Sequence, residues 1–167
     1  PVIPLFIVGA LKAPATVLGP TEGVAGILLN LVPGWSGPLG DKMGKRVPFV
    51  RWGYGFTSLS KPAMALATAW PLASAARLAD RFGKGLRNTS RDALLADVIE
   101  KDDAGRCFGY HRMMDAAGAV VGSLCGVALL LVFPGQYRLI FAVTIVPGIV
   151  AMWLTFLLKE SKHAEPT

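Results

Sequence analysis

Charged residues and cysteines are scarce in this sequence. Only 17% of its 167 residues are Asp, Glu, Lys or Arg, whereas a soluble domain carries about 25%. The two cysteines argue against a disulfide scaffold, and an apolar content of 53% excludes a disordered chain. The 19 glycines and 12 prolines agree with transmembrane helices, in which both residues are frequent. With a mean hydropathy of +0.49, the composition predicts an all-α, polytopic membrane protein rather than a soluble domain.

Six apolar segments follow one another along the chain, separated by short polar connections. Their expected ranges are 1–18, 20–38, 47–69, 70–98, 108–133 and 137–158. The first apolar run is shorter than the roughly 20 residues that a span requires, so we interpret it as the end of a truncated helix. The sequence thus predicts a single transmembrane bundle over 1–167, with about five full spans. A polar tail, cytoplasmic or the start of a central linker, is expected over 159–167.

The net charge of +6 is distributed unevenly. Seven basic residues lie on alternate connections and in the tail, namely Lys42, Lys45, Arg46, Lys101, Arg106, Lys159 and Lys162. Only two, Lys12 and Arg138, lie on the opposite connections. The positive-inside rule makes the richer side cytoplasmic. We therefore expect a multi-pass protein of the cell membrane, in bacteria the inner membrane, that contacts membrane lipid and no nucleic acid.

The fourth segment carries a charged face. At 100° per residue, seven charges fall within an arc of about 140°. They are Arg77, Asp80, Arg81, Lys84, Arg87, Arg91 and Asp92. Because charge is costly against lipid, this arc predicts a polar interior or a water-filled cavity. The alternative is an amphipathic helix on the membrane surface. Glu22 either faces this cavity or is a solvated carboxylate at a helix start, and Lys61 is expected to snorkel outward.

The fifth segment carries a sparser polar face. His111 and Asp115 are four residues apart, a spacing at which side chains of a helix touch. Gly118, Gly122 and Gly126 continue the same face as a stripe of small residues, which favours close helix packing. A carboxylate within a span is a functional candidate. Asp115 either carries a proton or forms a fixed ion pair, with Arg112 or with the basic face of the fourth segment.

The connection between the second and third segments carries a recognisable pattern, Gly37-x-Leu39-x-Asp41-Lys42-x-Gly44-Lys45-Arg46. It resembles the signature loop between helices two and three of the major facilitator superfamily. Gly37 and Gly44 would permit a tight turn and close helix approach. Asp41 would pair with a cation such as Arg81 or Arg91.

Two further stretches strengthen the resemblance. Arg81-x-x-Lys84-Gly85 is similar to the R-x-x-Q-G element of the family's fourth helix. The glycines at 109, 118, 122 and 126 fit the fifth-helix pattern of its antiporter members, although Ser123 stands where that pattern has proline. The resemblance covers nearly the whole chain and implies the N-terminal six-helix half of a transporter whose C-terminal half is missing here.

The resemblance implies a function for each set of residues. The residues Gly37, Asp41, Lys42, Gly44, Lys45 and Arg46 would form a gating loop that latches the two halves. The cavity for a small-molecule substrate would be lined by Arg77, Arg81, Lys84, Arg91, Asp92, His111 and Asp115. Its basic bias would favour an anionic solute.

The expected activity is proton-coupled efflux, with the proton gradient in place of any cofactor and with no catalytic residue or metal site. The alternative is a membrane-embedded bundle with a structural, receptor or lipid-modifying role. A lipid-modifying enzyme would need a constellation that the sequence lacks, because Asp92 and Asp97, five residues apart, share no ligand face.

Overall fold

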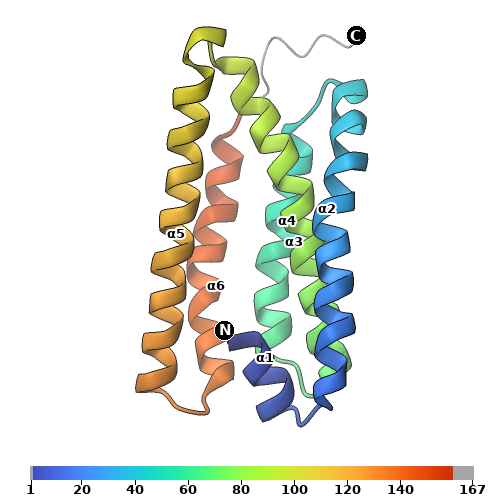
Figure 1. The fold of residues 1–167 in the computed structure, drawn as a ribbon, viewed down its shortest axis with the longest axis vertical. Coiled ribbons are helices and arrows are strands. Elements are labelled where there is room, and N and C mark those ends of the chain that lie inside the picture. Colours follow the sequence, from blue (N-terminus) through green and yellow to red (C-terminus); the bar gives the residue numbers. More distant parts are fainter. Residues whose placement is uncertain (1, 160–167) are drawn as a thin grey trace.

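The computed structural model describes residues 2–159, and all regular structure within that range is helical. The α-helices are α1 (Val2–Leu5), α2 (Leu18–Met43), α3 (Val47–Ala65), α4 (Trp70–Val98), α5 (Ala104–Val132) and α6 (Tyr137–Leu154). A π-helical turn, Phe6–Ala10, continues α1, and a 3₁₀ turn, Thr155–Leu157, follows α6. The predicted all-α fold is confirmed (Figure 1).

The helices lie side by side, and their connections alternate between two ends of the bundle (Figure 1). The connections 44–46 and 99–103 lie at one end, together with the end of α6. The connections 11–14, 66–69 and 133–136 lie at the other end. The first end carries most of the connecting Lys and Arg residues and is called the basic end below. Lys162 and the rest of the predicted tail beyond Lys159 lie outside the described residues.

Several helix limits differ from the predicted ones for local reasons. The predicted segment 70–98 coincides with α4. In contrast, α2 continues past Pro38 to Met43, because a proline removes only one backbone donor and both Pro33 and Pro38 are accommodated within the helix. The first helical stretch ends at Ala10, because Lys12 adopts a left-handed conformation with φ of 51°.

Among the described residues, three stretches are long and apolar enough to cross a membrane: Ala15–Met43, Ala104–Val132 and Tyr137–Leu157. The predicted spans α3 and α4 are more polar than these three. Composition alone therefore identifies fewer spans than the predicted five.

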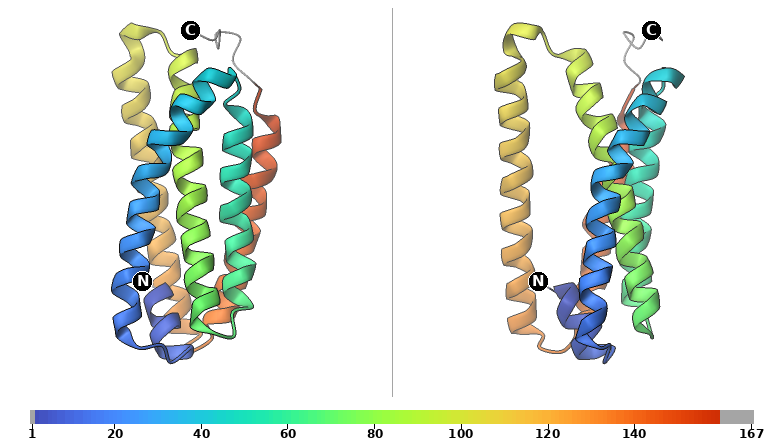
Figure 2. Two further views of the ribbon diagram at one scale, coloured as in Figure 1. Left: turned by 90° about the vertical axis from the view of Figure 1, so that its right-hand side faces the viewer. Right: turned by 45° about the vertical axis from the view of Figure 1, so that its right-hand side comes forward.

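The closest packing joins α4 to α3. A Cβ atom at Gly83 would lie 2.6 Å from the carbonyl oxygen of Gly53, so the two backbones meet where no side chain fits. The opposite end from the basic end is closed by a cluster in which Phe6 meets Phe141 edge-on at 5.1 Å. The fifth helix differs, because α5 contains no buried residue and lies apart from α2 and α3 (Figure 2).

Candidate functional site

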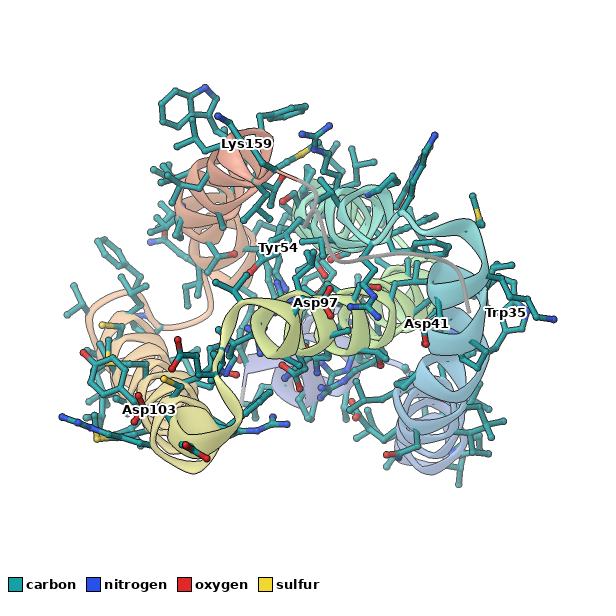
Figure 3. The ribbon with its side chains drawn as sticks, turned by 90° about the horizontal axis from the view of Figure 1, so that it is seen from above. Trp35, Asp41, Tyr54, Asp97, Asp103 and Lys159 are labelled. Atoms are coloured by element: carbon teal, nitrogen blue, oxygen red, sulfur yellow. The ribbon has the colours of Figure 1, made fainter. Side chains whose placement is uncertain are left out.

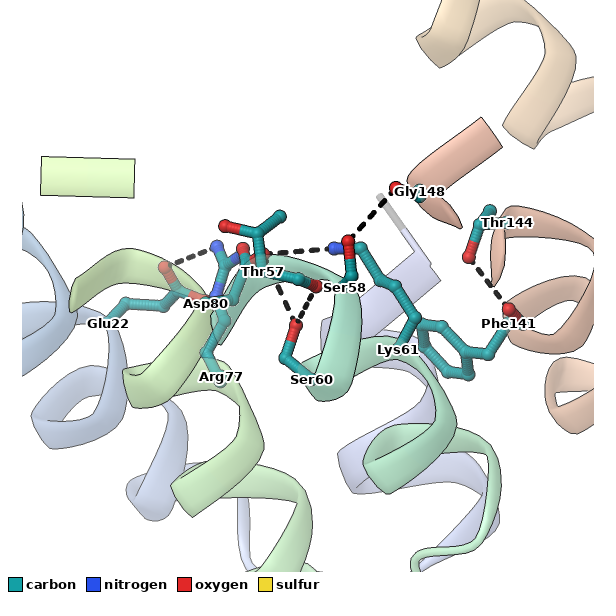
Figure 4. Close-up of polar contacts among 10 residues, drawn as sticks. All are labelled: Glu22, Thr57, Ser58, Ser60, Lys61, Arg77, Asp80, Phe141, Thr144 and Gly148. Carbon is teal, nitrogen blue, oxygen red and sulfur yellow. Dashed lines mark hydrogen bonds and ion pairs between the residues drawn. The ribbon is translucent and has the colours of Figure 1, made fainter. Parts of the chain in front are cut away.

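The charged face of α4 divides its side chains among its neighbours. At the end away from the basic end, Arg77 donates from Nε and Nη2 to the two carboxylate oxygens of Glu22 on α2, each at 2.9 Å. This two-pronged geometry is the strong form of an arginine–carboxylate pair. The sequence allowed Glu22 either to face the cavity or to lie in solvent. In the structure it pairs with Arg77 of α4 (Figure 4).

One turn further, Asp80 points to α3. Its Oδ1 accepts from Lys61 Nζ at 3.1 Å and from Ser60 Oγ at 3.3 Å, and Arg77 Nη1 lies 3.9 Å from Oδ2 (Figure 4). The Asp80 side chain is 11% exposed and that of Lys61 25%. The prediction that Lys61 snorkels outward is therefore wrong. A buried carboxylate within reach holds its ammonium group inside the bundle, where each charge compensates the other.

Arg87 also faces α3. Its guanidinium carbon lies 4.5 Å from the ring centroid of Tyr54, a cation–π contact. The Nε atom of Arg87 is buried without a hydrogen-bond partner among residues 2–159. Figure 3 places Tyr54 on the side of α3 that faces α6 and α4.

Nearer the basic end, α4 turns to α5. Arg91 donates to both oxygens of Asp115, with Nη2 at 2.7 Å and Nη1 at 3.3 Å. Beside this pair, Arg112 donates to Asp92 at 3.0 Å. Of the ion pairs expected for Asp115, the one with the basic face of the fourth segment is confirmed, and Arg112 pairs with Asp92 instead.

Three predicted cavity residues have no ion pair or hydrogen bond through their side chains within 2–159: Arg81, Lys84 and His111. The His111 Nδ1 atom is buried and accepts or donates no hydrogen bond among the described residues. These groups lie on the same α4 and α5 faces as the Arg91–Asp115 pair. Whether they line a transport cavity stays a prediction.

The gating loop is mostly helix. Of the motif, only Gly44, Lys45 and Arg46 lie outside α2 and α3, so the connection is shorter than the predicted segment limits of 38 and 47 imply. Gly44 has φ of 58° and ends α2, which confirms the tight turn at that glycine. A Cβ atom at Gly37 would lie 3.1 Å from Thr89 Cγ2 on α4, which confirms the expected close helix approach there.

The turn is fastened by Arg46. This residue donates to Asp41 Oδ1 from Nη2 at 2.7 Å and from Nε at 3.1 Å, to the carbonyl of Ala93 at 3.2 Å, and to Asp97. Burial lowers the pKa of Arg46, but the hydrogen bonds to Asp41 and Asp97 outweigh burial and raise it above its ordinary value. Figure 3 shows Asp41 on α2 and Asp97 on α4, so Arg46 links the turn to the end of a third helix.

The predicted pairing of Asp41 with Arg81 or Arg91 is wrong. Arg46 lies five residues from Asp41 and reaches it directly, while Arg91 is held by Asp115. Asp97 was missed as a member of this cluster. The available signal was its place in the last turn of the fourth segment, which ends on the same side of the membrane as the turn at 44–46.

The glycine stripe of α5 meets little within the described residues. A Cβ atom at Gly118 or Gly122 would have no neighbour within 4 Å, and one at Gly126 would meet only Val2 Cγ2, at 3.9 Å. A groove of about 600 Å³ runs along this stripe toward Phe141 and Pro147 of α6. Close packing at these glycines stays a prediction.

Ion pairs between the helices of a multi-pass bundle are typical of polytopic α-helical membrane proteins. Comparison with known proteins identifies the family. Residues 1–167 match the family model of the Major Facilitator Superfamily. An uncharacterised MFS-type transporter of Methanocaldococcus jannaschii is 30% identical over 163 residues, 96% of this chain and 40% of that protein. Uncharacterised proteins of Mycobacterium bovis and Mycobacterium tuberculosis are 31% identical over 157 residues, 92% of this chain and 38% of each relative.

The chain belongs to the Major Facilitator Superfamily, which confirms the resemblance carried by the motif at 37–46. It spans about two fifths of the length of the curated relatives named above. Family membership, together with the long apolar helices, indicates a multi-pass membrane protein.

Proposed function

We propose that the full-length protein containing this chain exports a small solute in exchange for protons, by alternating access of two helical bundles. In this proposal, residues 1–167 form one bundle and a second six-helix half forms the other. Family membership and the greater length of the relatives support this arrangement. The protein would lie in the cytoplasmic membrane with its basic end toward the cytoplasm, because connecting Lys and Arg residues gather there.

The Arg91–Asp115 pair is the observation that carries the proton-coupling step. It joins α4 to a helix without buried residues, so a large part of the polar attachment of α5 depends on it. Protonation of Asp115 would remove the negative charge that holds Arg91 and would favour a different position of α5. The charged or titratable groups around Asp115 are Lys84, Arg91 and Asp92 on α4 and His111 and Arg112 on α5.

The unpaired basic groups support an anionic substrate. Arg81 and Lys84 lack an ion pair within the described residues, whereas Asp80, Asp92 and Asp115 are each already paired with a cation. A carboxylate or phosphate on the solute would complete the charge balance of this face. We further propose that the turn held by Arg46 acts as the cytoplasmic latch between the two bundles.

The test is Asp115→Asn in the full-length protein, reconstituted in liposomes that contain a pH-sensitive dye. A panel of small carboxylates and phosphates is screened first on the unmodified protein for solute-dependent proton flux. In the variant, proton flux should fall to background, because a neutral amide cannot bind and release a proton. Exchange of labelled solute at equal pH should persist.

Asp103→Asn is the matched control, since Asp103 lies at the start of the same helix with its side chain outside the α4–α5 pairs. It should retain the proton flux of the unmodified protein. Undiminished proton-coupled flux in Asp115→Asn would overturn the coupling step.

A further inference from the structure

A second groove lies on the outer side of the bundle, between α3 and α6 near the basic end. It has a volume of about 430 Å³, and its walls are mainly the apolar side chains of Pro48, Trp52, Phe56, Leu59 and Met152. Trp52 and Leu59 are 67% and 69% exposed, so nothing within residues 2–159 covers them. The groove follows α3 from Pro48 to Leu59, about three helical turns from the basic end toward the middle of the helix.

Arg51 stands at the basic end of this groove. Its Nε and Nη2 donate long bonds, both 3.4 Å, to the carbonyls of Thr155 and Leu158, and its guanidinium lies 5.3 Å from the ring centroid of Phe156. No carboxylate among residues 2–159 forms an ion pair with it. Arg46, Arg77 and Arg91, by contrast, each bind a carboxylate. Arg51 is therefore a cation in a mainly apolar groove, and no anionic side chain among residues 2–159 pairs with it.

We propose that this groove binds one anionic phospholipid, with its phosphate on Arg51 and an acyl chain along Trp52, Phe56 and Leu59. The groove has a cation near the membrane surface and apolar side chains deeper in the membrane. A phospholipid has its charged phosphate and its acyl chains in the same sequence. Arginine matches phosphate with paired donors, and Trp52 beside it is the residue type that sits at the headgroup level. Basic side chains at the cytoplasmic surface attract anionic lipid.

Gly55 shapes the groove. A Cβ atom at this position would meet only Met152 Cε, at 3.9 Å, which is ordinary van der Waals contact. A larger side chain at Gly55 would therefore occupy the acyl-chain path without a clash at its Cβ.

The test is native mass spectrometry of the full-length protein in mixed micelles with equal amounts of phosphatidylglycerol and phosphatidylcholine. In Arg51→Gln, the ratio of retained phosphatidylglycerol to phosphatidylcholine should fall about fivefold, the effect of one basic residue at an anionic surface. Arg106→Gln is the matched control, because Arg106 is exposed at the same end and, like Arg51, has no ion pair within 2–159. It should change the ratio less than twofold. An equal fall in both variants, or an unchanged ratio in Arg51→Gln, overturns the proposal and leaves Arg51 as a cap for the carbonyls that end α6.

Gly55→Leu tests the acyl-chain path independently. It should remove the tightly retained lipid of either headgroup while the melting temperature stays close to that of the unmodified protein. Unchanged lipid retention overturns the proposal. A dimer that dissociates in Gly55→Leu would assign the groove to a second copy and would also overturn it. The lipid site does not depend on proton coupling, so both variants can be scored whether or not Asp115→Asn retains flux.

Discussion

The same residue types have opposite surroundings in the α3–α4 pair and in α5. Glycine at 83 in α4 lets two backbones meet, whereas Gly122 in α5 has open space where its Cβ would be. Asp80 in α4 is 11% exposed between Lys61 and Ser60, whereas Asp115 in α5 is 45% exposed. Identical residues thus stabilise a fixed contact in one region and a loosely packed contact in the other (Figure 2).

In the proposed mechanism, the α3–α4 pair is the fixed part of the bundle and α5 is the part that moves. The α3–α4 pair is held by closely packed backbones and by a buried ion pair. Separating either would cost several kcal/mol of free energy. The contact of α5 with α4 depends on side-chain ion pairs at 2.7 and 3.0 Å, without a buried residue on α5. Closely packed interfaces move as one body, so α5 is the element whose position a single protonation can change.

The largest effect is expected from Asp80→Ala, which would leave Lys61 charged and uncompensated among packed helices. Removing one partner of a buried pair costs about 3–5 kcal/mol of folding free energy. Denaturation of the full-length protein in detergent, with a graded increase in dodecyl sulfate, measures the loss. The double variant Asp80→Ala with Lys61→Met should recover most of it. If the double variant is as unstable as the single one, the compensation of Lys61 does not explain the role of Asp80.

An intermediate effect on folding stability is expected for alanine at Gly83 and at Gly122, with opposite signs at the two positions. At Gly83 the new Cβ would lie 2.6 Å from the Gly53 carbonyl oxygen and 2.7 Å from Phe56 Cβ. Such overpacking costs about 1–3 kcal/mol. At Gly122 the new methyl group meets nothing within 4 Å, and the higher helix propensity of alanine should stabilise the protein by about 0.5–1 kcal/mol.

The two glycine variants are compared by their melting temperatures in the same detergent. Gly83→Ala should melt below the unmodified protein and Gly122→Ala at or above it. A comparable loss in Gly122→Ala would mean that another part of the full-length protein packs on the α5 stripe, as the sequence predicts. The contrast between the two regions would then hold only for residues 2–159.

The sequence could predict what belongs to one helix. The start of α4 follows from a local signal, since Pro71 lies in the first turn, a position that proline favours. Its charged arc follows from the helical period alone. The C-terminal turn of α2 follows from Gly44, because the left-handed φ of 58° is one that glycine adopts freely.

The sequence could not predict which residues on different helices meet. Asp80 was placed on the correct arc, but its partner Lys61 depends on how α3 and α4 are offset, and that offset is fixed by the Gly53–Gly83 approach. The same holds for Arg87 with Tyr54 and for Arg46 with Asp97. A lone lysine inside a span was a usable signal, because an intramembrane charge requires a partner.

The smallest effect is expected for the pair that the mechanism uses most. In a double-mutant cycle of Arg91→Gln and Asp115→Asn, the coupling free energy should be only about 0.5–1 kcal/mol, because the Asp115 side chain is partly exposed. The Arg77 and Glu22 side chains are 13% and 41% exposed, against 23% and 45% for Arg91 and Asp115. Because Arg77 is the more buried arginine and both of its bonds are 2.9 Å long, this pair should couple somewhat more strongly in a parallel cycle with Arg77→Gln and Glu22→Gln. A weak pair suits a switch, since a proton must be able to break it. A coupling at Arg91–Asp115 equal to or above that of Arg77–Glu22 would place α5 within the fixed part of the bundle, and the proposed proton step would then have to lie elsewhere.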